Sequence, residues 1–216
     1  MVRTQVFNPE DVVQAGFDVV DAEGWDQLSA RRVAEVLGSS TAPVYSNFRN
    51  MSELAAAVVQ EAIRRFMAKT SNPQSGNRFL DFGWGVLDYA LAHPRWYDAL
   101  FREVQLPDDQ YRQLVAGMAR IMAATPELSV LPEFERQLVL KKMTIFTHGL
   151  ASEICTGHAG PLNREGMRLL LEEVGHAVMD DALKRPPRSV REMEMLDTCQ
   201  NCCPAEREPG KEEHHE

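Results

Sequence analysis

Apolar residues recur at helical spacing along most of this 216-residue chain, and no stretch alternates with period two for long enough to form a convincing strand. The first helical segment has a clear start, because Asn8 can cap it and Pro9 fits its first turn. Gly24 is expected to end it. The sequence therefore predicts an all-α fold.

A second, short helix and a tight turn follow the first helix. Ser29 can cap a helix that runs through Leu37, and Gly38 can take the left-handed conformation after it without a steric penalty from a Cβ atom. Ala34 is small, which lets the next helix cross close to this one. The spacing is therefore suited to a helix–turn–helix head.

The third helix is expected to start near Ser40 and to run to about Phe48. Pro43 costs little there, because in the first turn its missing N–H would have no partner within the helix. Val44 and Phe48 are four residues apart and are expected to form the buried face. A fourth helix is expected to begin at Ser52.

The composition divides the chain into two predicted domains and a tail. The polar segment 71–77 is typical of a linker, and the end of the chain is charged and contains prolines. The predicted parts are an N-terminal domain over residues 8–70 with its helix–turn–helix motif at 29–48, a helical C-terminal domain over 76–185, and a disordered tail over 186–216.

The segment LSARRVAEVLGSSTAPVYSNFRNMSEL resembles the DNA-binding part of the tetracycline-repressor (TetR/AcrR) family of bacterial transcription regulators. The resemblance covers roughly residues 9–65, including the Gly24 stop, the Ala-x-x-x-Gly turn and the Tyr-x-x-Phe ending. It implies a homodimeric regulator, for instance a repressor, whose two heads set their third helices into a palindromic double-stranded DNA operator. It also implies a small-molecule effector in the second domain that changes the spacing of the heads.

Carried onto this chain, the resemblance assigns base reading to Arg31 and to the start of the third helix. Arginine suits a bidentate contact with guanine, and small apolar residues can meet a thymine methyl. The polar side chains behind them are expected to contact phosphate or sugar. The predicted DNA-binding residues are Arg31, Thr41, Ala42, Pro43, Tyr45, Ser46, Asn47 and Arg49.

The charge of the head is low for a DNA-binding protein. The family usually has Lys at the position of Met51 and an aliphatic residue at that of Ser39. Residues 1–70 hold seven basic side chains (Arg3, Arg31, Arg32, Arg49, Arg64, Arg65, Lys69) and nine acidic ones (Glu10, Asp11, Asp18, Asp21, Glu23, Asp26, Glu35, Glu53, Glu61), a net charge of −2, and the whole chain carries −9. These features favour an alternative function, a helical ligand-binding or interaction protein that no longer binds DNA.

Bulky side chains concentrate in the second domain, where they either pack as core or line an apolar effector pocket with a few polar groups. His148 either orients a ligand or is merely hydrogen-bonded. The predicted pocket residues are Trp84, Tyr89, Trp96, Phe101, Met122, Met143, Phe146 and His148.

The last two predicted helices, 133–158 and 162–184, are long and amphipathic. Pairing them with the same helices of a second copy would give a four-helix dimer interface. The alternative is that both are packed within the monomer.

Three cysteines cluster near the end of the chain: Cys199, Cys202 and Cys203, with His214 and His215 beyond them. The C-x-x-C spacing suits a soft metal ion, but the second half of a zinc site is missing, so a redox or incidental role is the alternative. No cofactor is predicted. No Ser-His-Asp or metal-hydrolase spacing appears, so the chain is predicted not to be an enzyme.

No apolar run approaches the roughly 18–20 residues that a membrane span needs. The first residues, MVRTQVFNPED, also lack the apolar segment of a signal peptide. We therefore expect no membrane partner and a cytoplasmic location.

Overall fold

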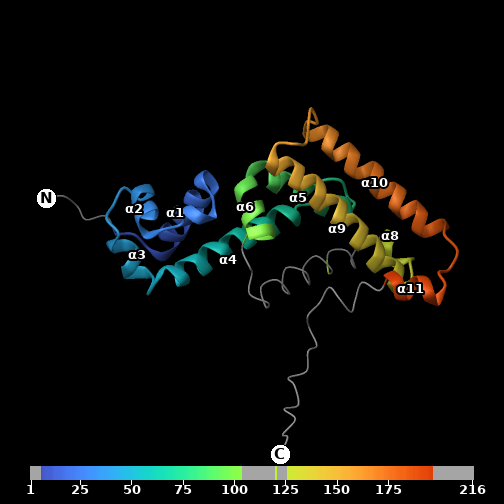
Figure 1. Ribbon diagram of the computed structural model, residues 1–216, viewed down its shortest axis with the longest axis horizontal. Helices are drawn as coiled ribbons and strands as arrows, with labels where there is room; N and C mark the ends of the chain where they lie inside the picture. The colour runs from blue at the N-terminus through green and yellow to red at the C-terminus, as the bar shows by residue number, and fades with distance from the viewer. Residues whose placement is uncertain (1–5, 104–119, 121–125, 197–216) are drawn as a thin grey trace, which may run out of the picture.

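The computed structural model describes residues 6–103, 120 and 126–196, and every regular element among them is helical (Figure 1). The all-α prediction is confirmed. In chain order the elements are α1 (Pro9–Glu23), a 3-10 turn η1 (Trp25–Gln27), α2 (Ala30–Val36), α3 (Ala42–Asn47), α4 (Met51–Thr70), α5 (Arg78–Ala92), α6 (Pro94–Asp98), a π-helical turn η2 (Ala99–Glu103), α8 (Pro126–Ser129), α9 (Glu133–Thr156), α10 (Arg164–Lys184) and α11 (Val190–Leu196).

The first two helices begin as the sequence predicts. The Asn8 side chain accepts the Asp11 N–H at 2.8 Å, and the Asp11 carboxylate accepts the Asn8 N–H at 2.9 Å, which makes a complete capping box. The Ser29 hydroxyl accepts the Arg32 N–H at the start of α2. Gly38 follows α2 with a φ of 63°, the left-handed conformation expected of it.

The third and fourth helices begin at other residues than predicted. Helix α3 starts at Ala42, because the Ser40 hydroxyl accepts the Ala42 N–H and so closes the preceding turn rather than capping the helix. Helix α4 starts at Met51, because Asn50 caps it by accepting the Glu53 N–H at 2.9 Å.

Helix α3 is held to the head by the two apolar residues that the spacing predicts. Val44 is 1% exposed and Phe48 is 9% exposed, and both belong to the main core cluster. Ala42, Tyr45 and Ser46 lie exposed on the outer faces of the helix.

Helix α4 packs on α1 and, further along, on α5, so it connects the three-helix head to the rest of the chain (Figure 1). The second contact is unusually close: a Cβ atom added to Gly85 of α5 would lie 2.5 Å from the Thr70 Cα. Only glycine lets the two backbones approach this far.

A second connection joins α1 directly to α6. Trp96 is fully buried, stacks on Phe17 with ring centres 5.0 Å apart, and donates its indole N–H to the Phe17 carbonyl at 3.0 Å. The ring of His93 lies 3.0 Å from the Asp21 carboxylate beside it. The head and the second part of the chain therefore share one continuous core.

Helices α5, α9 and α10 pack against one another in the second part of the chain. Asp88 of α5, whose side chain is only 4% exposed, accepts hydrogen bonds from Arg164 at 2.7 Å and from Arg168 at 3.0 Å, both on α10. Burial raises the pKa of Asp88, but the bonds and charges of the two arginines outweigh this and lower its pKa. Asp88 therefore stays ionised and fixes α10 on α5.

Residues 186–196, which the composition assigns to a disordered tail, contain the short helix α11. Ser189 and Glu192 form a reciprocal cap at the start of α11, and Arg188 makes a buried ion pair with Glu135 of α9 at 2.7 Å. Composition alone misses such specific pairs. Residues 197–216, with Cys199, Cys202, Cys203, His214 and His215, lie outside the described residues.

Candidate nucleic-acid interface and effector pocket

The outer face of α3 carries small and hydroxyl side chains. Thr41, Ala42 and Ser46 are exposed, Pro43 is half-buried, and Tyr45 is 57% exposed. The Ser46 hydroxyl donates to the Pro43 carbonyl at 3.0 Å, whereas the Tyr45 hydroxyl has no hydrogen-bond partner within the described part of the chain. This face is therefore exposed and can contact another macromolecule.

Asn47 is turned inward rather than outward. Its side-chain amide donates to the Pro43 carbonyl at 2.8 Å and to the Phe7 carbonyl, forty positions away in sequence, at 3.2 Å. The resemblance assigns Asn47 to phosphate or sugar, but the structure uses its donor group to hold the head together.

Most cations of the head are paired with acids. Arg31 is 86% exposed but donates to Glu35 at 3.0 Å, and Arg32 is paired with both Glu23 and Glu35. The hydrogen bond from Arg31, together with the charge of Arg32, lowers the pKa of Glu35. Arg49 is exposed and has no ion pair in the described part of the chain.

The start of α4 offers little attraction to a phosphate, as the absence of a lysine at position 51 suggests. Met51 is half-buried and packs on the core, so it replaces a cationic contact by an apolar one. The Glu53 carboxylate accepts the Arg49 N–H at 2.7 Å and therefore places a negative charge at this helix end.

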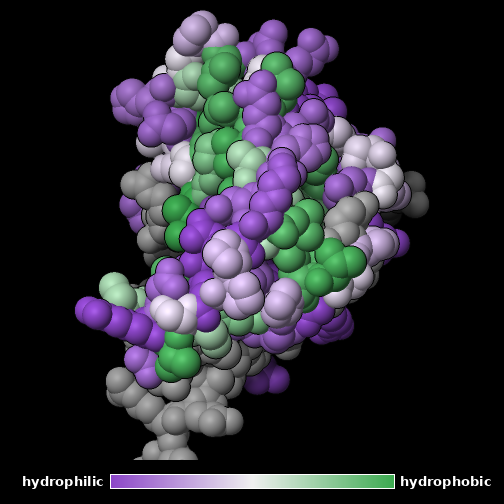
Figure 2. Space-filling model, turned by 90° about the vertical axis from the view of Figure 1, so that its right-hand side faces the viewer, coloured by the Kyte–Doolittle hydropathy of each residue, from purple (hydrophilic) through white to green (hydrophobic). Residues whose placement is uncertain are grey.

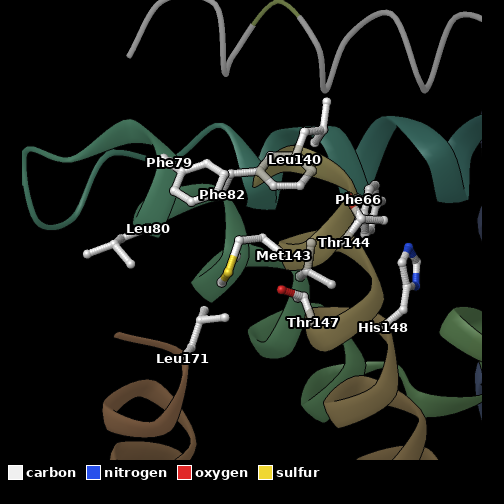
Figure 3. A pocket seen from close by; sticks show the side chains of 12 residues that line it. Phe66, Phe79, Leu80, Phe82, Leu140, Met143, Thr144, Thr147, His148 and Leu171 are labelled. Atoms are coloured by element: carbon white, nitrogen blue, oxygen red, sulfur yellow. The ribbon is translucent and has the colours of Figure 1, made fainter. Parts of the chain in front are cut away.

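An apolar pocket lies where α4, α5, α9 and α10 meet (Figure 3). Its free volume is about 30 Å³, so a ligand larger than water has to push side chains apart. None of the described residues that line it is charged. The lining residues are Phe66, Phe79, Leu80, Phe82, Gly83, Val86, Leu140, Met143, Thr144, Thr147, His148 and Leu171.

Two of the predicted pocket residues, Met143 and His148, line this cavity. Trp96 is instead buried against α1, and the Tyr89 hydroxyl donates to the Ala62 carbonyl. Trp84 lies under the guanidinium of Arg168. Phe101 packs on His148 and Phe146 on the core, outside the lining, and Met122 lies outside the described residues.

The sequence analysis missed the lining phenylalanines of α4 and α5 and the threonines of α9, and of these only the α9 threonines have a signal in their spacing. Leu140, Met143, Thr144, Thr147 and His148 recur at intervals of three and four and so lie on one face of α9. A search along the helix face that carries His148 would have found them.

His148 is hydrogen-bonded, and it also faces the pocket. The Tyr97 hydroxyl contacts its Nδ1 atom, and the Phe101 ring packs at 4.8 Å between centres. Burial lowers the pKa of His148 and raises the pKa of Tyr97, so both are neutral at pH 7. One proton is therefore shared between the Tyr97 hydroxyl and Nδ1 of His148, and the imidazole tautomer decides which of the two groups donates.

Helices α9 and α10 expose apolar side chains. Ile145 is 63% exposed, Leu169 is 56% exposed and Leu183 is 52% exposed. Figure 2, which views the end of the molecule where α10 lies, shows apolar areas on both sides of a polar strip. Within the described residues, none of the helices combines the length and apolar character needed to cross a membrane.

No protein-family model matches the chain, but one curated protein and several solved structures are similar to it. An uncharacterized HTH-type transcriptional regulator of Mycobacterium tuberculosis is 25% identical over 139 residues, and the match spans 62% of each protein's length.

Three solved structures are similar to the model. A TetR-family transcriptional regulator from Rhodococcus sp. aligns with a TM-score of 0.59 and 20% identity, over 79% of this chain and 98% of that one. A TetR regulator from Streptomyces coelicolor gives 0.56 and 17% over 83% and 100% of the chains, and the fatty acid degradation regulator FadR from Bacillus halodurans gives 0.51 and 12% over 82% and 97%. These likenesses confirm the resemblance found in the sequence: the chain has the fold of the TetR-family transcriptional regulators.

Proposed function

We propose that the protein is a DNA-binding transcriptional regulator, a repressor that binds a palindromic operator as a homodimer and leaves it when a small molecule binds. The observation that carries this is the outer face of α3, which is exposed, small and rich in hydroxyl groups, on a head anchored by Val44 and Phe48. Residues 8–70 would bind DNA and residues 76–185 the effector and the second copy, in the cytoplasm.

DNA recognition of this kind would depend on shape and hydroxyl contacts more than on cations. Tyr45 and Ser46 can reach phosphate or sugar, and Thr41 and Ala42 are placed for base edges. Arg31 remains suited to guanine, because its exposed ion pair with Glu35 is weak enough to exchange.

The exposed apolar side chains of α9 and α10 support a homodimer. Ile145, Leu169 and Leu183 would lose contact with water in a four-helix interface, which is the driving force of such assemblies. A twofold dimer would present two α3 helices to successive major grooves of one duplex.

The pocket supports an effector that acts through α4. Phe66, which lines the pocket, also packs on Tyr89 and Phe101, and the preceding residue Arg65 lies 3.9 Å over the Phe17 ring of α1. A ligand that pushes Phe66 aside would therefore displace α4 relative to the head.

The lining favours an uncharged effector. The described lining residues are apolar apart from Thr144, Thr147 and the neutral His148, and among them a charged group would lose its hydration without a partner. The Thr144 and Thr147 hydroxyls can donate a hydrogen bond, which suits a ligand with one acceptor, such as a carbonyl oxygen.

Direct DNA binding tests the proposed function. We expect the protein to retard a duplex from the region upstream of its own gene, with two chains per duplex, and with a salt slope well short of about −10 because cations are few. Arg49→Ala should weaken binding about tenfold. Arg78→Ala, an exposed arginine at the start of α5, is the matched control and should change nothing.

A failure to bind this duplex or unrelated DNA would reject the proposal. It would favour the alternative of a ligand-binding or interaction protein, which the packing of Met51 and the position of Glu53 already support to a degree.

A matched pair of probes tests the effector pocket. We expect 2-acetylnaphthalene to raise the melting temperature and 2-naphthoate, with the same ring system and a negative charge, to have no effect, because the described lining residues include no lysine or arginine. The measurement is a thermal melt with increasing probe. Equal stabilisation by both compounds would contradict an uncharged effector.

A further inference from the structure

A groove lies along the outside of the joint between α4 and α5, separate from the apolar pocket. Its free volume is about 580 Å³, so it has room for a small molecule as it stands. The described residues that line it come from the last two turns of α4, the linker that follows, and the end of α5. They include three cations, Arg64, Arg65 and Lys69, and no acid, although the whole chain carries a net charge of −9.

Two of these cations already converge on one anionic group. Arg64 donates to the Glu61 carboxylate through Nε and Nη2, both at 2.7 Å, and Arg65 donates to it through Nε at 2.7 Å. The bonds from Arg64 and then Arg65 outweigh burial and lower the pKa of Glu61 to about 2. One carboxylate balances only one of the two guanidinium charges, so a positive charge remains at the groove.

The third cation adds to this charge further along α4. Lys69 is exposed and has no ion pair within the described part of the chain, and it follows Arg65 by four residues, about 6 Å along the same helix face. Ser71 and Asn72 beyond it offer a hydroxyl and an amide that can donate hydrogen bonds. The carbonyl end of α4 opposes an anion with only about half an elementary charge, which the cations outweigh.

The other end of the groove is less positive. His93 lines it there, and its ring lies 3.0 Å from the Asp21 carboxylate. The anionic groups of a ligand are therefore expected at the end that carries Lys69.

A DNA phosphate is the other anion that these cations could meet. Arg64 lies thirteen positions beyond Met51, the first residue of α4, which corresponds to about 20 Å along the helix. The groove is therefore far from the end of α4 that follows α3. A small anion in solution fits this position better than the operator.

We propose that the groove is a second ligand site, for a small anion with two negatively charged groups, phosphates or carboxylates, about 6 Å apart. Arg64 and Arg65 would bind one group, and Lys69 with Asn72 the other. This ligand differs in charge from the effector proposed for the apolar pocket. The proposal does not depend on DNA binding.

Isothermal titration calorimetry of the full chain, at constant ionic strength and with EDTA present, tests the site. Pyrophosphate and citrate are the two probes, and sulfate is the control with a single anionic group. We expect at least one probe to bind with one molecule per chain, and sulfate to bind about tenfold more weakly or not at all. The tighter probe identifies the ligand as a phosphate or as a carboxylate.

Variants at exposed positions locate the site. Lys69→Gln and Arg64→Gln should each weaken binding of the tighter probe by about five- to tenfold, and Lys69→Glu should weaken it further. Lys69→Arg should retain most of the binding, because the charge is kept. Arg191→Gln, which removes an exposed cation on α11, is the matched control and should change nothing.

Four results would overturn the proposal. The unaltered protein could bind neither probe, or sulfate could bind as tightly as both. Lys69→Gln could leave binding unchanged, or Arg191→Gln could weaken it equally, which would show an effect of net charge and not of a site. An additional measurement uses the duplex from the upstream region: if Lys69→Gln weakened its binding, the cations would belong to the DNA interface and the proposal would be rejected.

Discussion

Trp96→Ala is expected to destabilise the protein by about 3–5 kcal/mol, the usual cost of removing a large buried aromatic side chain. Trp96 is fully buried between Phe17 and Trp25, with ring centres 5.0 and 6.2 Å away, and its indole N–H bonds to the Phe17 carbonyl. Alanine would leave a cavity between α1 and α6. Urea unfolding followed by circular dichroism measures the change.

The matched variant for this position is Trp96→Phe. It keeps an aromatic ring against Phe17 and removes the N–H donor and part of the volume, so about 1–2 kcal/mol should be lost. A loss below about 1 kcal/mol in Trp96→Ala would mean that the two parts of the chain do not depend on this contact for stability.

The second large effect is expected at Gly85. In Gly85→Ala the new Cβ would lie 2.5 Å from the Thr70 Cα and 2.7 Å from the Lys69 carbonyl oxygen. Both are backbone atoms, which cannot move away by a change of rotamer. The helices α4 and α5 would have to separate, at a cost of about 1–3 kcal/mol or more. Thermal unfolding and far-ultraviolet circular dichroism are the measurements.

Gly149→Ala is the matched control, since Gly149 also lies inside a helix, α9, but the added Cβ would have no atom within 4 Å among the described residues outside its own helix backbone. There alanine should stabilise the protein by about 0.5–1 kcal/mol through its better helix propensity. Opposite signs for the same substitution would show that the close approach of α4 and α5, and not loss of glycine as such, is responsible. Equal effects would contradict this.

Local signals in the sequence were enough to predict the head. The capping box at Asn8, the turn at Gly38 and the buried pair of Val44 and Phe48 depend on residues only a few positions apart. The start of α4 was misplaced because Ser52 and Asn50 both suit a cap, and only the backbone conformation shows which one is used.

The pocket could be predicted much less well, because it depends on contacts between distant segments. Trp96 is as large and apolar as a pocket residue should be, but its place is set by Phe17, far away in sequence. Asn47 has a side chain of a type that often contacts DNA, but its amide donates to the Phe7 carbonyl instead. Side-chain type alone does not say which neighbour a polar or aromatic group will find.

The two arginines that share Asp88 also fix the rotation of α10 about its own axis. Arg164 and Arg168 lie one turn apart, so both hydrogen bonds to Asp88 would break if α10 rotated about its axis. The adjacent Leu169 is therefore held facing outward before any second copy arrives. Such preorganisation lowers the entropy lost on association, so the apolar surface of α10 would bind a partner more tightly than its area suggests.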